Sequence, residues 1–379
     1  MPKRMALFIP FFVVVLAGTI VYRNAGRDPD PVASKSSLIQ PSPHSNAALK
    51  SDQQEQALAA FIASQMTGPK GIYTNLKDTD QSEAAATGHE YLSESASLMM
   101  RYAVLSRNKE LFTTQWRNAK ETFNMAEGFS YRYSPKLDKL YPVTAAIDDL
   151  RLIRSLYEAG DAFKEPAYIR EADQYGARFY KNHVKNGFLY DFYDENYKTN
   201  NSFITLCYIN LKTLGKLSID DEWSGELQHN MQGVIEKGYL SDAFPFYETR
   251  FTYDTQKYSS ENINTVESLL TILSLAEVGM AKASSIDYIE QQVEEGKLYG
   301  QYTRDGVPTT DIRSTAIYAI TAMIGSEIGD EALYLKSIAR MNEFRVQDKN
   351  STLYGGFGDV SSKQAYSFDN LMALLAYRY

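Results

Sequence analysis

Apolar side chains recur at helical spacing along most of the chain, and the alternation typical of strands is almost absent. Between Thr87 and Phe123, for example, Leu98, Tyr102 and Leu105 would share one helical face. The same pattern predicts twelve helices, at residues 52–66, 93–106, 109–126, 145–160, 165–183, 200–214, 220–237, 260–278, 285–295, 310–324, 330–345 and 367–379.

These helices fall into two kinds. FITLCYINL (203–211) and TVESLLTILSLA (265–276) are apolar on nearly every face, which predicts inner helices. KEPAYIREADQYGARFYKNHV (164–184) carries its charges on one face, which predicts an outer helix.

A tyrosine-rich connection recurs about every 45–60 residues, a spacing suited to repeated helical hairpins. Its six copies are GIYTNL (71–76), GFSYRY (128–133), GFLYDFY (187–193), GYLSDAFPFY (238–247), GKLYGQY (296–302) and STLYGGFG (351–358). Six equivalent hairpins suggest a closed ring whose long loops gather at one end. The aromatic rings would then line a cleft or, alternatively, plug the floor of the barrel.

The N-terminus differs in composition from the rest. Lys3 and Arg4 precede an apolar run from Met5 to Tyr22, which is long enough to cross a bilayer. We expect residues 1–24 to be a signal anchor or a cleaved signal peptide, 25–50 a flexible Pro- and Ser-rich tether, and 51–379 one catalytic domain. Either interpretation places the bulk of the protein outside the cytoplasm, tethered to the cell membrane or secreted.

Composition narrows the function. The net charge of -8 argues against nucleic acid as a partner. An aromatic content of 13%, dominated by 28 Tyr, is compatible with sugar binding. A single cysteine, Cys207, excludes an intrachain disulfide, and four scattered histidines do not suggest a metal site. We expect a monomer that acts on a polysaccharide or oligosaccharide without a cofactor.

Phosphate-binding and serine-nucleophile motifs are absent from the sequence, which leaves carboxylate chemistry. The candidates in loops or at helix starts are Glu94, which follows Glu90 at the start of a helical pattern, and Asp148, Asp149 and Asp254. In a ring of hairpins they would share one end. Each could instead complement a helix N-terminus or, for Asp254, form a turn.

Two segments resemble glycoside hydrolase family 8. In YLSESASLMMRYAVLSRNKELFTTQWRNA, Ser93-Glu94 matches the Ser-Glu of the family's SEGQGYGM signature, and Trp116 matches its Trp. In AAIDDLRLIRSL, Asp149 matches the Asp before Leu in TDADLDIAYAL. The chain resembles a divergent bacterial, exopolysaccharide-associated member of that family.

The resemblance implies an all-α (α/α)6 barrel and an inverting glycosidase. Glu94 would be the general acid, and Asp149 would bind the sugar ring at the cleavage subsite. A second carboxylate, roughly 6.5–9.5 Å away, would activate water.

The sequence departs from the family pattern at the position of the general base. The family's Asp is replaced by Asn264, and Glu267 takes the place of an Arg. Asp254 is the best substitute for the base, while Glu261 and Glu267 are weaker candidates. A helix N-terminus would lower the pKa of Glu94, so burial and the charge of Asp149 would have to outweigh it.

Sugar contacts are expected from further side chains at the same end. They are Asp148, Asp149, Tyr131, Arg132, Tyr190, Tyr193, Tyr247, Arg250, Asn264 and Tyr302.

The sequence therefore predicts an inverting glycoside hydrolase acting on an extracellular or cell-surface polysaccharide. Two alternatives stay open: a non-catalytic polysaccharide-binding barrel that has lost its base, and a polysaccharide lyase.

Overall fold

A computed structural model describes residues 48–379 of the chain. The predicted signal segment and most of the predicted tether lie outside the described residues. The first helix begins at Ala48, three residues before the predicted domain boundary. Within the described part of the chain, no helix is long and apolar enough to span a membrane.

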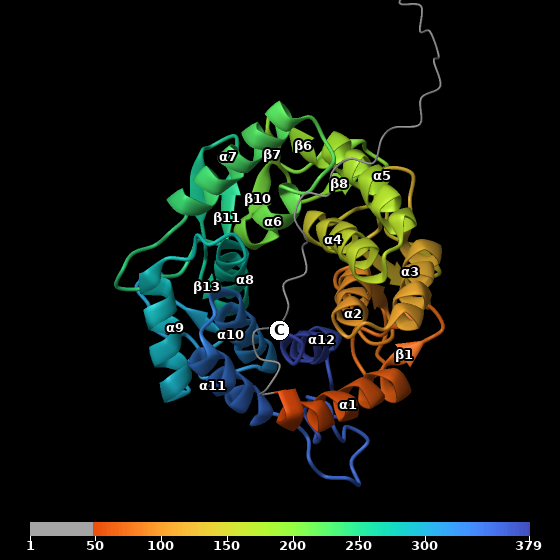
Figure 1. The fold of residues 1–379 in the computed structure, drawn as a ribbon, viewed down its shortest axis with the longest axis vertical. Coiled ribbons are helices and arrows are strands. Elements are labelled where there is room, and N and C mark those ends of the chain that lie inside the picture. Colours follow the sequence, from red (N-terminus) through yellow and green to blue (C-terminus); the bar gives the residue numbers. More distant parts are fainter. Residues whose placement is uncertain (1–47) are drawn as a thin grey trace, which may run out of the picture. The chain divides into compact units, whose positions relative to one another are not determined.

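The described residues form two concentric rings of helices (Figure 1). The inner ring comprises α2 (Ser93–Leu105), α4 (Ala146–Phe163), α6 (Leu211–Leu214), α8 (Thr265–Ala276), α10 (Thr315–Ile328) and α12 (Ser367–Ala376). The outer ring comprises α1 (Ala48–Gln65), α3 (Lys109–Phe123), α5 (Pro166–His183), α7 (Asp221–Lys237), α9 (Ala283–Glu295) and α11 (Glu331–Asn342).

Inner neighbours pack in the order α2, α4, α6, α8, α10, α12 and back to α2, which closes the ring. A short 3₁₀ helix, η1 (Leu206–Tyr208), precedes α6 and packs against α8. This arrangement confirms the predicted all-α (α/α)6 barrel. Because each inner helix is followed by an outer helix that returns, the N-termini of all inner helices lie at one end.

The predicted helix at residues 200–214 is mostly wrong. Its first part is a strand, β10 (Phe203–Thr205), followed by η1 and the single turn of α6. Thr205 is held extended because its amide and its hydroxyl donate to the two carboxylate oxygens of Asp191, at 2.5 and 2.6 Å. This tertiary contact overrides the helical pattern of the apolar residues. The other predicted helices agree with the structure to within about five residues.

The connections form short antiparallel hairpins rather than plain loops. Besides β10, the strands are β1 (Thr67–Gly68), β2 (Gly71–Ile72), β3 (Tyr91–Leu92), β4 (Arg132–Ser134), β5 (Lys139–Leu140), β6 (Val184–Lys185), β7 (Phe188–Leu189), β8 (Tyr193–Asp194), β9 (Thr199–Asn200), β11 (Arg250–Thr252), β12 (Lys257–Ser259), β13 (Ile263–Asn264) and β14 (Gln301–Tyr302). The pairs are β1–β2, β3–β4–β5, β6–β7, β8–β9, β10–β11–β12 and β13–β14. The tyrosine-rich repeats lie in these connections.

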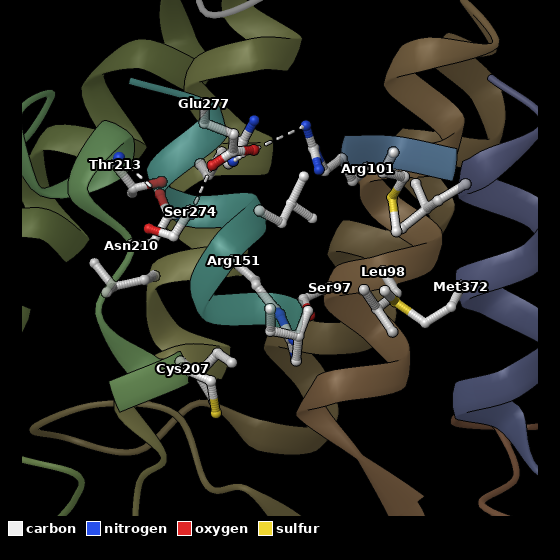
Figure 2. A pocket seen from close by; sticks show the side chains of 17 residues that line it. Ser97, Leu98, Arg101, Arg151, Cys207, Asn210, Thr213, Ser274, Glu277 and Met372 are labelled. Atoms are coloured by element: carbon white, nitrogen blue, oxygen red, sulfur yellow. Dashed lines mark hydrogen bonds and ion pairs between the residues drawn. The ribbon is translucent and has the colours of Figure 1, made fainter. Parts of the chain in front are cut away.

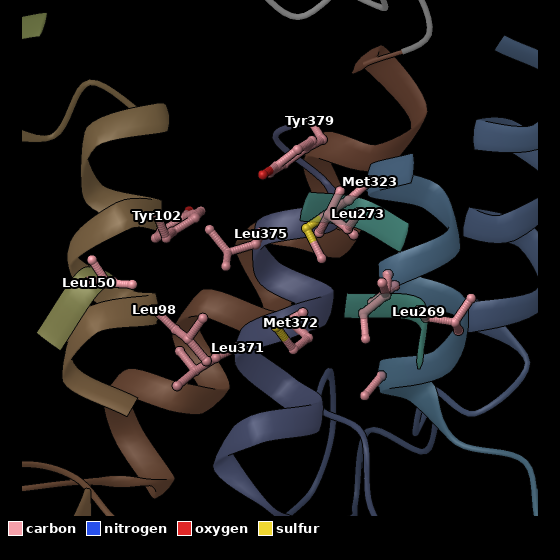
Figure 3. Close-up of a cluster of buried hydrophobic side chains, with 14 of the residues drawn as sticks. Leu98, Tyr102, Leu150, Leu269, Leu273, Met323, Leu371, Met372, Leu375 and Tyr379 are labelled. Atoms are coloured by element: carbon pink, nitrogen blue, oxygen red, sulfur yellow. The ribbon is translucent and has the colours of Figure 1, made fainter. Parts of the chain in front are cut away.

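Apolar side chains of the inner helices fill the middle of the barrel. Leu98 of α2, Leu269 of α8 and Met372 of α12 belong to one buried cluster (Figure 3). Trp116 of α3, which matched the family signature, is also buried and packs edge-on against Phe129. Trp116 also packs edge-on against Tyr175 of α5, so it joins two neighbouring helices of the outer ring.

A buried charge cluster lies toward the C-terminal ends of the inner helices. Arg154 pairs with Glu158 at 2.8 Å and with Glu277 at 2.5 Å, and Arg101 pairs with Glu158 at 3.3 Å. All of these side chains are nearly inaccessible to solvent except that of Arg101. Removing one partner of such a cluster leaves a buried charge without compensation.

We therefore expect Arg154→Met to destabilise the fold by about 3 kcal/mol or more. Urea unfolding followed by circular dichroism measures the change. Lys109→Met is the matched control, because it removes an exposed ion pair to Glu165 and should leave the midpoint nearly unchanged. Equal midpoints for the two variants would contradict the structural role of the cluster.

Candidate active site

Two carboxylates meet at the N-terminal end of the inner ring. Glu94 lies in the first turn of α2 and Asp148 in the first turn of α4. The guanidinium of Arg151 lies 3.5 Å from Glu94 and 3.4 Å from Asp148. The hydroxyl of Ser93 donates to the other oxygen of Asp148 at 3.0 Å. Arg151 is thus shared by two carboxyl groups. The three side chains together carry a net negative charge when both carboxyls are ionised.

The pKa of Glu94 is raised to about 7, mainly by burial and in part by the charge of Asp148, while Arg151 opposes the shift. Burial likewise raises the pKa of Asp148. The side chain of Glu94 nevertheless keeps 28% of its surface exposed. A carboxyl that holds its proton near neutral pH and still reaches solvent can act as a general acid. A raised pKa of Glu94 is the direction that the role of a general acid requires.

The neighbour that causes part of this rise was predicted wrongly. Asp149 is buried and turned away from Glu94, because successive helical residues point about 100° apart. Its side chain accepts a hydrogen bond from the backbone amide of Phe129 and lies against Gly128. Burial raises its pKa, and the charge of Arg178 on α5 opposes that rise. Asp148, not Asp149, is therefore the acid beside Glu94.

Asp191 brings a further carboxylate to the same end. Its carbonyl oxygen accepts the amide of Ala146 at 2.7 Å, so it lies at the level where α4 begins. Both of its carboxylate oxygens accept hydrogen bonds from Thr205. Burial raises the pKa of Asp191 to about 6, with a smaller contribution from Glu267.

Glu267 lies in the first turn of α8. In the inner ring α8 is three positions from α2, so Glu267 and Glu94 begin helices on opposite sides. Burial raises the pKa of Glu267, while a hydrogen bond from Thr249 and the charge of Arg250 lower it. Its side chain is only partly buried, which leaves it accessible to water.

Two residues of η1 interact electrostatically with these groups. Cys207 interacts electrostatically with Glu267, Arg151 and Asp191. Tyr208 interacts with Asp148, Asp191 and Glu94. The acids of α2, α4 and α8 therefore surround one common space.

A small cavity of about 70 Å³ lies on the barrel axis (Figure 2). Its lining runs from Cys207 and Arg151 to Arg101 and Glu277 of the buried charge cluster. It has room for water but not for a sugar. Among the described residues, no group of His, Cys, Asp or Glu side chains is arranged to hold a metal ion.

Comparisons with known proteins agree with this arrangement. No protein-family model matches the chain. An alpha-amylase from Clostridium perfringens is 35% identical, with a TM-score of 0.80 over 86% of this chain and 97% of its own. The endoglucanase Cel10 of Klebsiella pneumoniae, a family 8 glycosyl hydrolase, has 15% identity and a TM-score of 0.59 over 85% of this chain and 98% of its own.

The chain is a glycoside hydrolase with the fold of family 8. The suspected resemblance and the enzyme class are thereby confirmed, and the lyase and non-catalytic alternatives lose support. "Putative lipoprotein YdaJ" of Bacillus subtilis (strain 168) is 29% identical over 327 residues, which cover 84% of this chain and 85% of that protein.

In this glycoside hydrolase, Asp254 does not lie beside the acids described above. It is exposed in the turn between β11 and β12, and its charge acts on Tyr190. Arg250, which acts on Glu267, lies at the other end of β11. Four residues of extended chain span about 13 Å. The structure therefore does not favour Asp254 as the base.

Three predicted sugar contacts have structural roles instead. Arg132 is 1% exposed, because it pairs with Glu90 at 2.8 Å and donates to backbone carbonyls of residues 82–85. Tyr247 is 2% exposed and packs on Tyr239. Asn264 caps α8 by accepting the amide of Glu267 at 3.2 Å. Arg132 and Tyr247 were wrong predictions, since a sugar cannot reach them.

The remaining candidates are accessible in the connections. Tyr131, Tyr190 and Tyr193 are partly buried, and Arg250 is exposed with its guanidinium 3.7 Å from the centre of the Phe203 ring. Tyr302 is buried. Sequence reasoning missed Asp191 and Arg151. The available signal for Asp191 was an acid within the aromatic repeat GFLYDFY.

The raised pKa of Glu94 predicts a pH profile. The acid must be protonated to donate, so kcat/KM should fall as pH rises through about 7. Initial rates between pH 5 and 9, on a glucan that the enzyme cleaves, measure this alkaline limb of the pH profile. A rate that stays constant to pH 9 would show that Glu94 is not the proton donor.

The neighbouring aspartates can be separated by the same assay. Asp148→Asn removes the charge that raises the pKa of Glu94, so the alkaline limb should move to lower pH. Asp149→Asn should leave the limb in place, because Asp149 faces Phe129 and Arg178. A limb that moves only in the Asp149 variant would reverse the assignment.

Proposed function

We propose that this protein hydrolyses glycosidic bonds of an extracellular or cell-surface glucan with inversion of the anomeric centre. Glu94 is the general acid and Glu267 the general base. The observation that carries the proposal is the position of the two glutamates, which begin opposite helices of the inner ring at the same end.

The acid role rests on the pKa and the exposure of Glu94. Burial and Asp148 keep the carboxyl protonated at pH values where an ordinary glutamate has lost its proton. Arg151 limits the rise, and it stabilises the carboxylate after the proton has been given to the leaving oxygen.

The base role rests on access. An inverting enzyme needs room for one water between the base and the sugar, and its carboxyls lie about 6.5–9.5 Å apart. Glu267 is partly accessible and begins the helix opposite that of Glu94, whereas both oxygens of Asp191 accept hydrogen bonds from Thr205. Asp254 lies in an exposed turn. Glu267, which the sequence ranked below Asp254, therefore fits the base best.

Asp148 is suited to hold the sugar ring at the cleavage position. It lies on the α4 and η1 side of the space between the two glutamates. Carboxylates accept strong hydrogen bonds from sugar hydroxyls. Asp148 thus takes the role that the sequence motif gave to Asp149.

The relatives support the choice of substrate and location. The Clostridium perfringens relative is an alpha-amylase, so α-linked glucans are the first substrates to try, with β-linked glucans beside them. The relative from Bacillus subtilis carries a lipoprotein name, and the apolar run from Met5 to Tyr22 supports an exported, membrane-tethered enzyme.

Glycosyl fluorides separate the two catalytic roles. Fluoride leaves without a proton, so Glu94→Gln should lose about 10²–10⁴-fold on a glucan but much less on the fluoride of the same anomer. Glu267→Gln should lose a similar factor on both substrates, because water must be activated in each case. Released reducing ends and fluoride measure the two reactions.

Asp254→Asn and Asp191→Asn complete the experiment. Asp254→Asn should keep nearly full activity, because its side chain lies in an exposed turn. Full activity of Glu267→Gln together with an inactive Asp254→Asn or Asp191→Asn would transfer the base role to that aspartate.

A further inference from the structure

The small cavity on the barrel axis is lined by more positive than negative groups. Arg101, Arg151 and Arg154 contribute three guanidinium groups to its lining, and Glu277 contributes one carboxylate (Figure 2). The other lining side chains carry no charge. Glu158 pairs with Arg101 and Arg154 at 3.3 and 2.8 Å but does not line the cavity. A negative charge inside the cavity would therefore be surrounded mainly by cations.

Arg154 has a hydrogen-bond donor that is left over. Its Nε donates to Glu158 at 2.8 Å and its Nη1 to Glu277 at 2.5 Å. Its Nη2, by contrast, has no hydrogen-bond partner among residues 48–379. Because only 5% of the Arg154 side chain is exposed, bulk water does not supply an acceptor. A buried, charged donor of this kind calls for an acceptor inside the cavity.

Thr213 of α6 supplies a second donor of the same kind. Its hydroxyl also lacks a partner in the described part of the chain, and the residue is 1% exposed. The side-chain oxygen of Asn210 accepts the amide of Thr213 at 2.8 Å. The second carboxylate oxygen of Glu277 accepts a hydrogen bond from the side chain of Asn210 at 2.9 Å. The cavity thus offers free donors, while the acceptors beside them are in use.

This balance distinguishes an anion from water. A buried water molecule usually makes about three hydrogen bonds, and it must donate some of them. An anion only accepts, so it matches a lining whose unused groups are donors. The volume of about 70 Å³ suits a small anion that is similar in size to a water molecule, such as a halide.

We propose that the axial cavity is a binding site for a halide ion, with chloride as its natural occupant. The Nη2 of Arg154 and the hydroxyl of Thr213 donate to the ion, and the guanidinium groups of Arg101 and Arg151 add attractive charge. The site itself does not depend on the proposed hydrolase function. Its effect on catalysis, which runs through Glu94, rests on that function.

Arg151 links the ion to the acid. Its guanidinium lines the cavity and also lies 3.5 Å from Glu94 and 3.4 Å from Asp148. On the other elements around Glu94, Tyr208 of η1 interacts with it, and Asp369 of α12 accepts a backbone amide of α10. Burial and Asp148 raise the pKa of Glu94, and Arg151 opposes them. An anion beside Arg151 weakens this opposition, so chloride should move the alkaline limb of kcat/KM to higher pH.

Thermal unfolding of the full-length protein tests binding without turnover. In chloride the midpoint should rise with the logarithm of the salt concentration, since an ion that binds only the folded state stabilises it. Sodium methanesulfonate at equal ionic strength supplies the reference. Thr213→Val, which keeps the shape of the side chain but removes the donor, should weaken chloride binding about tenfold, equivalent to about 1.4 kcal/mol.

Thr271→Val is the matched control. Thr271 is also 1% exposed and lies on an inner helix, α8, but its hydroxyl donates to the backbone carbonyl of Glu267 at 3.0 Å and it does not line the cavity. This variant should keep the full chloride dependence of the midpoint. Bromide soaked into crystals gives an independent readout, because its anomalous scattering should place an ion between Arg154 and Thr213.

Equal midpoints of the unmodified protein in chloride and in methanesulfonate would overturn the site, even if bromide were seen at crystal concentrations. Equal chloride dependence of the Thr213→Val and Thr271→Val proteins would also overturn it, because the ion would then bind elsewhere. A chloride-dependent midpoint with an alkaline limb that ignores chloride would refute the link to Glu94 alone. Full activity of Glu94→Gln would refute the proposed acid and leave the midpoints unaffected.

Discussion

The parallel alignment of the six inner helices is the constraint on which the rest of the structure depends. It gathers the first turns of α2, α4 and α8 at one end, although these segments are far apart in sequence. Each first turn contributes a carboxylate, and the short hairpins add Asp191 from a connection. The closed ring thus acts as a rigid frame that sets acids at fixed positions around one space.

This arrangement creates an electrostatic conflict that burial resolves. A helix N-terminus favours an ionised carboxylate, yet a general acid must stay protonated. Burial and the neighbouring Asp148 outweigh the helix and the cation Arg151, so the pKa of Glu94 rises to about 7. The second charge cluster, around Arg154 and Glu277, lies deeper in the barrel. It tolerates burial because each of its acids pairs with a cation. The cluster with an excess of carboxylates is the more open of the two, since 28% of the Glu94 side chain is exposed.

The sequence predicted the helices and the barrel because apolar periodicity reports directly on which face of a helix is buried. It failed at residues 200–214, where a contact between Asp191 and Thr205 holds the chain extended. The sequence motif pointed to Glu94 and Asp149, whereas the helical phase of α4 places Asp148 beside Glu94. Asp254 was chosen for its loop position, yet the length of the β11–β12 hairpin carries it away from Glu267. Such register and distance effects are set by tertiary pairing, which a single sequence does not encode locally.

The account depends on two glutamates that face each other with space for a water molecule between one of them and the sugar. Proton NMR of the first sugar released from a glucan measures the consequence most directly, because the anomeric proton identifies the product before it equilibrates. The account predicts that the first product has the anomeric configuration opposite to that of the cleaved linkage. A first product with the retained configuration would contradict it, since retention requires a nucleophilic carboxylate only about 5–5.5 Å from the acid.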